Sequence, residues 1–160
     1  MNIFALSMDV VEAARWHLDK HIVKMPLETA QMMCTSLNKI GVETPYLPVH
    51  QKHPCTIWAG ISQENFSWLG NLGLALCAEY TYRYGKIHKC QSIIKFCLEK
   101  TCYFDNLGMT NFAQAMPDEY KCADSITAYR KFYIFGKKHL HQWTGRPIPK
   151  WIIDNKICNN

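Results

Sequence analysis

Five polar residues recur at spacings of three and four in an otherwise apolar stretch near the start of the chain. These five residues, called the polar stripe below, are His17, His21, Lys24, Glu28 and Gln31. Side chains at such spacings lie on one face of an α-helix. Because the flanking residues are mostly apolar, we expect the helix to be buried. A buried polar group is costly unless it is paired, so we interpret the polar stripe as functional.

Metal binding is one possible use of the two histidines. Their i,i+4 spacing is that of zinc ligands on helices, and the candidates for a third ligand are Asp19, Glu28, His50 and His53. The sequence has no His-Glu-x-x-His motif, and the ammonium groups of Lys20 and Lys24 repel a cation. We therefore predict neither a metal nor another cofactor.

Acid–base and covalent catalysis is the second possibility, and anion binding is the third. A buried lysine loses its proton more readily, so Lys24 can attack a carbonyl-like carbon while a neighbouring histidine or carboxylate moves protons. The same face can instead hold a phosphate. The structural alternative is a pair of core histidines beside an ordinary Lys24–Glu28 ion pair. The predicted catalytic residues are Lys24, Glu28, His21 and His17.

The polar stripe requires a helix, and most of residues 9–38 are predicted to form a single one. We expect Asp9 to cap its start and Glu12 to complete a capping box. Pro26 should kink or divide this helix, because proline lacks a backbone donor. The apolar residues 1–8 are expected to form a brief strand or an extended lead-in against the core.

The rest of the chain is predicted to be helical between irregular loops. Proline and glycine indicate a loop over residues 39–54, and apolar residues in the irregular stretch 101–120 indicate a segment that covers the core or a site. Further helices are expected over residues 54–60, from a cap at Ser62 to Tyr84 before Gly85, over residues 88–100, and from a cap at Ser125 to Leu140.

Basic, amide and aromatic side chains outside the predicted catalytic set are candidates for contacts with DNA or a nucleotide. In the proline-containing tail, basic and aromatic residues alternate as in surfaces that grip phosphate and stack on bases. The alternative for the tail is an arm that folds back on the domain. The predicted binding residues are Lys20, His53, Asn65, Arg83, His88, Trp143, Arg146 and Lys150.

Composition limits the class of protein. The 160 residues favour one all-α domain spanning 1–160, and a net charge of +5 permits nucleic-acid binding without requiring it. The chain has no long apolar run and no signal-peptide pattern at its start, so we expect no membrane partner. Its eight cysteines lack Cys-x-x-Cys spacing and are interpreted as reduced core thiols in a reducing compartment, with a disulfide scaffold as the alternative.

Segments spread over nearly the whole chain resemble a family of small helical proteins of phages and large DNA viruses. That family has no established activity, so the resemblance implies a viral origin and a location in the host cytoplasm. The segments that carry it are His17–Glu28, His53–Cys55, Glu79–His88, Phe112–Tyr120 and Ala128–Tyr133.

The beginning of the chain also resembles the pyrimidine-dimer DNA glycosylase family, phage endonuclease V. The shared features are an apolar start, an Ala-x-x-His-Leu step from Ala14 to Leu18, and a charged turn that ends at Pro26. The resemblance implies an all-α domain that binds DNA and exposes a base. In that family a free α-amine near the chain start attacks the sugar, and a glutamate on this helix assists.

This sequence departs from that family at two points. Lys24 stands at the position of the glutamate, and the bulky Asn2 disfavours removal of Met1, which the family's nucleophile needs. A retained Met1 amine is one possible replacement. Lys24 as a Schiff-base nucleophile with Glu28 as its acid/base is the other, and it restores a similar reaction with exchanged parts.

We therefore expect a viral DNA-acting enzyme that works on a base or its glycosidic bond. Such an enzyme must extrude the base, on which Trp143 or Trp151 can stack. The alternatives are a base-modifying transferase, a hydrolase of free nucleotides, and a module that binds a nucleotide or a host protein without chemistry.

Overall fold

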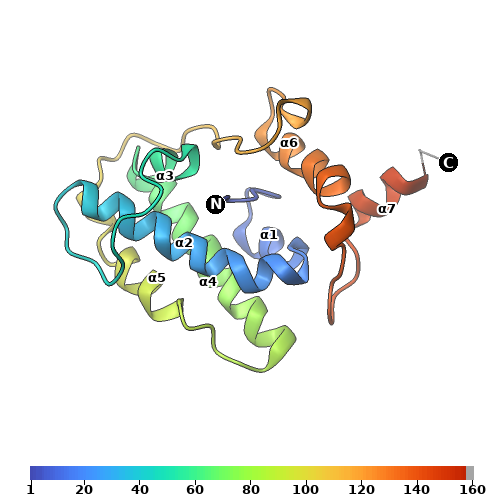
Figure 1. The fold of residues 1–160 in the computed structure, drawn as a ribbon, viewed down its shortest axis with the longest axis horizontal. Helices are drawn as coiled ribbons and strands as arrows, with labels where there is room; N and C mark the ends of the chain where they lie inside the picture. The colour runs from blue at the N-terminus through green and yellow to red at the C-terminus, as the bar shows by residue number, and fades with distance from the viewer. Residues whose placement is uncertain (158–160) are drawn as a thin grey trace.

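Two long helices, α2 (Asp19–Lys39) and α4 (Gln63–Tyr84), pack together at the centre of the structure and run in roughly opposite directions (Figure 1). The structure is a computed structural model that describes residues 1–157. Around the central pair lie α1 (Val10–Trp16), α3 (Pro54–Ala59) and α5 (Gln91–Leu98). Because the described residues form helices and no strands, the predicted all-α class is confirmed. No described helix combines the length and the apolarity that crossing a membrane requires.

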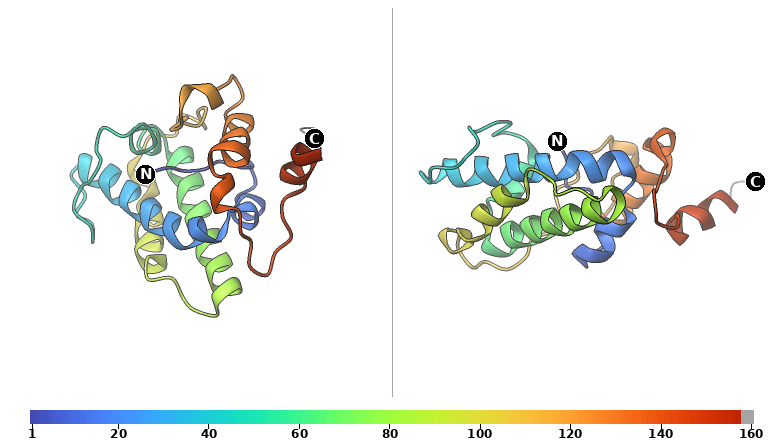
Figure 2. Two further views of the ribbon diagram at one scale, coloured as in Figure 1. Left: turned by 45° about the vertical axis from the view of Figure 1, so that its right-hand side comes forward. Right: turned by 90° about the horizontal axis from the view of Figure 1, so that it is seen from below.

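The C-terminal part of the chain contains α6 (Ser125–Lys131), which continues into a π-helical turn, Phe132–Gly136. The predicted α-helix from a cap at Ser125 to Leu140 is therefore too long, and its cap is Asp124, whose side chain accepts from the Thr127 N–H. An extended arm then leads to α7 (Lys150–Ile157) at the far end of the molecule (Figure 2). Short 3₁₀ turns complete the connections at Thr101–Tyr103, Asp118–Tyr120 and Lys138–Leu140.

The single helix predicted over residues 9–38 is instead two helices, α1 and α2, separated at His17 and Leu18. Both of these residues have extended backbone conformations. Tertiary contacts hold the break open, because the N–H of Asp19 donates to the Gln142 carbonyl and that of Leu18 donates to the Tyr133 hydroxyl. His17 consequently lies outside the helix that carries the rest of the polar stripe.

Helix caps at several boundaries match their predictions, whereas one detail of α1 and one of α2 differ. Asp9 caps α1, Ser62 caps α4, and Gly85 ends α4 with a φ of 65°. The capping box does not form, since Glu12 accepts a hydrogen bond from the Ser7 hydroxyl. Pro26 does not divide α2, which continues unbroken to Lys39. Packing of the buried face of this helix outweighs the loss of one backbone hydrogen bond.

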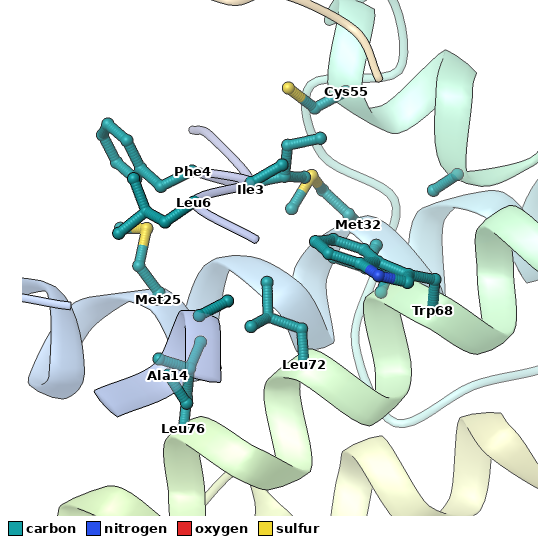
Figure 3. Close-up of a cluster of buried hydrophobic side chains, with 14 of the residues drawn as sticks. Ile3, Phe4, Leu6, Ala14, Met25, Met32, Cys55, Trp68, Leu72 and Leu76 are labelled. Atoms are coloured by element: carbon teal, nitrogen blue, oxygen red, sulfur yellow. The ribbon is translucent and has the colours of Figure 1, made fainter. Parts of the chain in front are cut away.

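The N-terminal segment is an extended strand-like lead-in that runs through the core instead of along its surface. Residues 2–6 are buried, and the chain start lies centrally in one view and at one face beside α2 in another (Figures 1 and 2). Ile3 lies near Met32 and Cys55, whereas Phe4 points to the opposite side (Figure 3). The fold therefore brings the first residues of the chain against the polar face of α2.

Cysteines within the described range are free thiols, and five of them are buried. Two of these five, Cys34 of α2 and Cys97 of α5, have sulfur atoms 3.7 Å apart. Cys158 lies outside the described residues, as does the chain end that follows it.

Candidate functional site

Two primary amines meet one buried carboxylate beside the N-terminal segment. The Met1 amine lies 3.7 Å from Oε2 of Glu28, and Nζ of Lys24 lies 3.2 Å from Oε1. The Asn2 N–H donates to Oε2 of Glu28 at 2.8 Å. The Glu28 side chain is only 8% exposed, so these contacts replace the water that it loses on folding. Lys24 and Glu28 of the predicted catalytic set are thus joined by a group from the chain start.

These groups line a pocket with a volume of about 270 Å³, called the N-terminal pocket below. Its wall combines the N-terminal segment, α2, the loop at 115–117 and the end of the π-helical turn. The lining residues are Met1, Asn2, Phe4, His21, Lys24, Met25, Glu28, Ala115, Met116, Pro117, Phe132 and Lys137. Residues 115–117, within the stretch 101–120 that was predicted to cover the core or a site, thus line this pocket.

The first two residues are fixed in place by contacts with three other segments. The Met1 side chain is 3% exposed, and its sulfur accepts a hydrogen bond from the Thr56 hydroxyl at 3.4 Å. The Asn2 side chain donates to the Ala115 carbonyl at 2.7 Å and accepts from the Ile3 N–H at 2.8 Å. Anchoring on both sides of the amine orients it toward Glu28.

His21 forms one wall of the pocket between an aromatic ring and a hydroxyl. The Phe4 ring stacks on it with centroids 4.2 Å apart, and its Nδ1 lies 2.6 Å from the Tyr133 hydroxyl. Phe4 has a φ of 38°, in the left-handed region that costs energy for a side chain of this size. Burial, together with the charges of His17, Lys137 and Lys24, lowers the pKa of His21 to about 2. His21 is therefore neutral at physiological pH.

His17 lies behind this wall and does not line the pocket. Its Nδ1–H donates to the Ala13 carbonyl at 2.7 Å, whereas its buried Nε2 has no hydrogen-bond partner among the described residues. Burial lowers the pKa of His17 to about 4. Its ring centroid is 6.2 Å from that of His21, so the two predicted catalytic histidines are neighbours with different surroundings.

Lysine side chains are the cationic part of the pocket on its solvent side. Lys24 is 67% exposed, and Lys137 is half-buried with its ammonium 4.7 Å from the centre of the Phe132 ring. Burial lowers the pKa of Lys137, as does the charge of Lys24, while Glu28 acts in the opposite direction. The pocket thus holds three amines against a single carboxylate.

Arg83 and Arg146, predicted to bind nucleic acid, belong to a separate ion network. Arg83 is fully buried, with Nη1 2.8 Å from Asp19 and Nε 2.8 Å from Glu79. Arg146 donates twice to Glu79, each time at 2.9 Å. Burial raises the pKa of Glu79, but the hydrogen bonds from Arg146 and Arg83 outweigh it and leave the pKa lowered. This network joins α2, α4 and the C-terminal arm.

The other predicted binding residues are spread over the molecule. Trp143 is buried and donates to the Trp16 carbonyl, so the arm folds back on the domain as the alternative interpretation expected. Asn65 is buried between the Trp58 carbonyl and Thr110. His88 is hydrogen-bonded to the Val23 carbonyl at 3.0 Å. Lys20 and Lys150 are exposed outside the pocket lining.

His53 is a predicted binding residue whose charge state is influenced by the N-terminal amine and by Glu28. Its Nδ1 accepts from the Cys55 N–H and caps α3. Burial lowers the pKa of His53, and the positive charge of the nearby N-terminal amine lowers it further. His53 is thus close enough to the amine to feel its charge, but it does not line the pocket.

The sequence analysis missed Phe4, Tyr133 and Lys137, which approach α2 from distant parts of the chain. Among the described residues, no group of three or more His, Cys, Asp or Glu side chains is arranged to hold a metal ion.

Comparisons with protein-family models, with curated proteins and with solved structures each returned no match.

Proposed function

We propose that this protein acts on DNA at a base or its glycosidic bond, by amine-dependent chemistry of the glycosylase/lyase type. The observation that carries the proposal is the meeting of two primary amines and one buried carboxylate in the N-terminal pocket. A primary amine is the nucleophile of Schiff-base chemistry, and an adjacent carboxylate can move its proton. The resemblance of the chain start to pyrimidine-dimer DNA glycosylases supports DNA as the substrate.

The reaction needs only groups that the pocket holds. The neutral amine forms a bond to C1′ of the deoxyribose while the C1′–base bond breaks and its electron pair leaves with the base. The nitrogen passes one proton to Glu28, and its lone pair then forms the C1′=N bond as O4′ departs. Glu28 returns the proton to O4′. The product is a ring-opened iminium that joins protein and DNA.

Of the two amines, we favour that of Met1 as the nucleophile. Its side chain is buried and Asn2 is anchored, so the amine is held in one orientation. Lys24 is largely exposed and loses more side-chain freedom when it is ordered. Lys24 remains the second candidate.

Borohydride trapping on a duplex with one abasic site tests this proposal. Intact mass spectrometry first establishes that Met1 carries a free amine, and peptide mapping then locates the reduced adduct. We expect the adduct on Met1 and its loss when two residues are added before Met1. Lys24→Arg should abolish trapping only if Lys24 is the nucleophile, because a guanidinium stays protonated. Lys20→Arg, on the same helix outside the pocket, is the matched control.

Glu28→Gln completes the variant set. The amide keeps an acceptor for the Asn2 N–H but cannot take a proton, so trapping should slow by about 100-fold. The absence of an adduct on abasic DNA with the wild-type protein would overturn the proposal.

The excess of amines over carboxylates favours a second candidate function, the capture of a nucleotide or DNA phosphate without chemistry. In that case Lys24→Arg retains binding, and no adduct forms under borohydride. Calorimetric titration with a mononucleotide and with a short duplex, each at two salt concentrations, measures this. A steep loss of affinity with salt indicates polymeric DNA.

A further inference from the structure

The contacts of Tyr133 determine which ring nitrogen of His21 carries the proton. The Tyr133 hydroxyl is fully buried, lies 2.6 Å from His21 Nδ1, and accepts a hydrogen bond from the Leu18 N–H at 3.4 Å. Among the described residues, His21 Nδ1 is the acceptor within reach of the hydroxyl proton. A buried O–H without an acceptor is costly. Nδ1 therefore accepts, and the proton of the neutral ring resides on Nε2.

The surroundings of His21 keep this ring neutral and fixed. The titratable and charged groups that face it are His17 and Lys24 from α2 and the residues before it, Lys137 beyond the π-helical turn, and the Tyr133 hydroxyl. Lys24 and Lys137 are positively charged, and His17 is positive when it is protonated, so each of them opposes a second proton on the ring. Phe4 covers one ring face in a strained backbone conformation that the core must hold in place.

The N–H of His21 is free for a ligand. His21 lines the N-terminal pocket, and no described residue hydrogen-bonds to its Nε2. His21 lies one helical turn before Lys24 and two turns before Glu28, on the same face of α2. A group bound against the two amines thus meets a neutral, preorganised donor on the α2 wall.

We propose that His21 donates its Nε2–H to the O2 oxygen of a pyrimidine base as that base leaves. This inference rests on the proposed function and assigns His21 a role in it. When the C1′–N1 bond breaks, the electron pair passes to N1 and is shared with O2, where negative charge develops. The Nε2–H bond stays intact throughout, and the departing anion takes its proton from water. A fixed donor aimed at developing charge lowers the barrier because it needs no reorganisation.

A neutral donor suits a pyrimidine better than adenine. Adenine carries no exocyclic oxygen next to its glycosidic nitrogen, and its departure is aided by proton transfer. His21 has no proton to transfer at neutral pH, because burial lowers its pKa to about 2. The same low proton affinity leaves the hydrogen bond to an oxygen available across the physiological range.

The experiment separates departure of the base from capture of the sugar. Borohydride trapping rates are measured on an abasic duplex and on duplexes with one uracil, one 5-hydroxymethyluracil or one pyrimidine dimer. His21→Phe keeps an aromatic ring against Phe4 but removes the donor. We expect it to slow trapping on the fastest base-containing duplex by about 100-fold more than it slows trapping on the abasic duplex. Abasic trapping also reports that the variant is folded.

A second measurement follows the role of Tyr133 as a positioning residue. Nitrogen-15 NMR of the ring distinguishes the two neutral tautomers, and we expect His21 to carry its proton on Nε2. Tyr133→Phe should mix the tautomers and slow only the base-containing reaction. When the neutral ring carries its proton on Nδ1, Nε2 is not a donor, so that tautomer should not speed the base-containing reaction.

Three outcomes overturn the inference while leaving the proposed function intact. They are equal slowing of both reactions in His21→Phe, a wild-type protein that traps abasic DNA but processes no pyrimidine duplex, and a proton found on Nδ1. If the wild-type protein forms no adduct on abasic DNA, the proposed function itself is overturned, so the two failures are distinguishable.

Discussion

Charged groups are drawn inside this protein at two places, and the two clusters are built differently. In the Arg83 network, two arginines face two carboxylates, with every ion-pair distance between 2.8 and 2.9 Å. In the N-terminal pocket, three amines face one carboxylate, and the two that contact it lie 3.2 and 3.7 Å from its oxygen atoms. The first cluster is closed and neutral, whereas the second borders a pocket of about 270 Å³ and carries an excess of cations.

The charges of the Arg83 network pair with one another and hold segments of the fold together, whereas the amines of the N-terminal pocket have fewer fixed partners. Arg83 also donates to the Arg15 carbonyl, and Asp19 accepts from Thr144, so the network uses nearly all of its donors and acceptors internally. Lys24 and Lys137 have no such set of fixed partners. Two of the predicted binding residues, Arg83 and Arg146, are basic for a structural reason, because they attach the C-terminal arm to the central helices.

Removal of Arg83 should have the largest effect of the changes considered. Arg83→Met leaves Asp19 without its cationic partner and Glu79 without one of its two cationic partners. Breaking a buried pair in this way costs about 3–5 kcal/mol of unfolding free energy. Urea denaturation followed by circular dichroism measures this loss.

Arg146→Met provides the matched control for this prediction. The Arg146 side chain is 24% exposed and Glu79 keeps Arg83, so the loss should be smaller. Equal losses for the two variants would show that the network is not organised around Arg83.

Acidification should weaken the wall of the N-terminal pocket before it affects the ion network. The pKa of His17 falls from 6.5 to about 4 on folding, and that of His21 to about 2. The unfolded chain therefore binds more protons below pH 6.5, so stability is complete above that pH and is lost as the pH falls. At its limit the loss is about 1.4 kcal/mol per pH unit for each histidine.

Measuring the free energy of unfolding between pH 6.5 and 5 separates the contribution of the histidines from that of the carboxylates. Asp19 and Glu79 have lowered pKa values, so their contribution is lost only at more acidic pH. His17→Phe should remove its share of the slope in this window. A slope that stays unchanged in that variant would mean that His17 is protonated in the folded protein.

Local chemistry was enough to predict several helix boundaries but not the break between α1 and α2. Ser62 and Gly85 act on the residues beside them, and each limits α4 as predicted. The break at His17 and Leu18 depends on the Gln142 carbonyl and the Tyr133 hydroxyl, which lie far along the chain. The helical spacing of polar and apolar residues does not depend on such distant partners, so it predicted a single helix.

The candidate site, too, could be predicted from the sequence only in part. Helical spacing placed His21, Lys24 and Glu28 on one face, and the structure brings all three to one pocket. The groups that complete the pocket come from the chain start and from residue 137, whose approach depends on tertiary packing. One available signal was the apolar run after Asn2, since a buried lead-in holds the adjacent amine near the core.

The smallest expected change sharpens the contrast between the two clusters. Lys24→Gln removes an exposed partner of Glu28, which keeps the Asn2 N–H and the Met1 amine. Exposed ion pairs contribute about 0–1 kcal/mol, so the unfolding free energy should change by less than about 0.5 kcal/mol. Urea denaturation at low and at high salt measures it, with Lys20→Gln as the matched control. A loss close to that of Arg83→Met would mean that Lys24 holds the fold, and that the pocket is a second structural network instead of a site for chemistry.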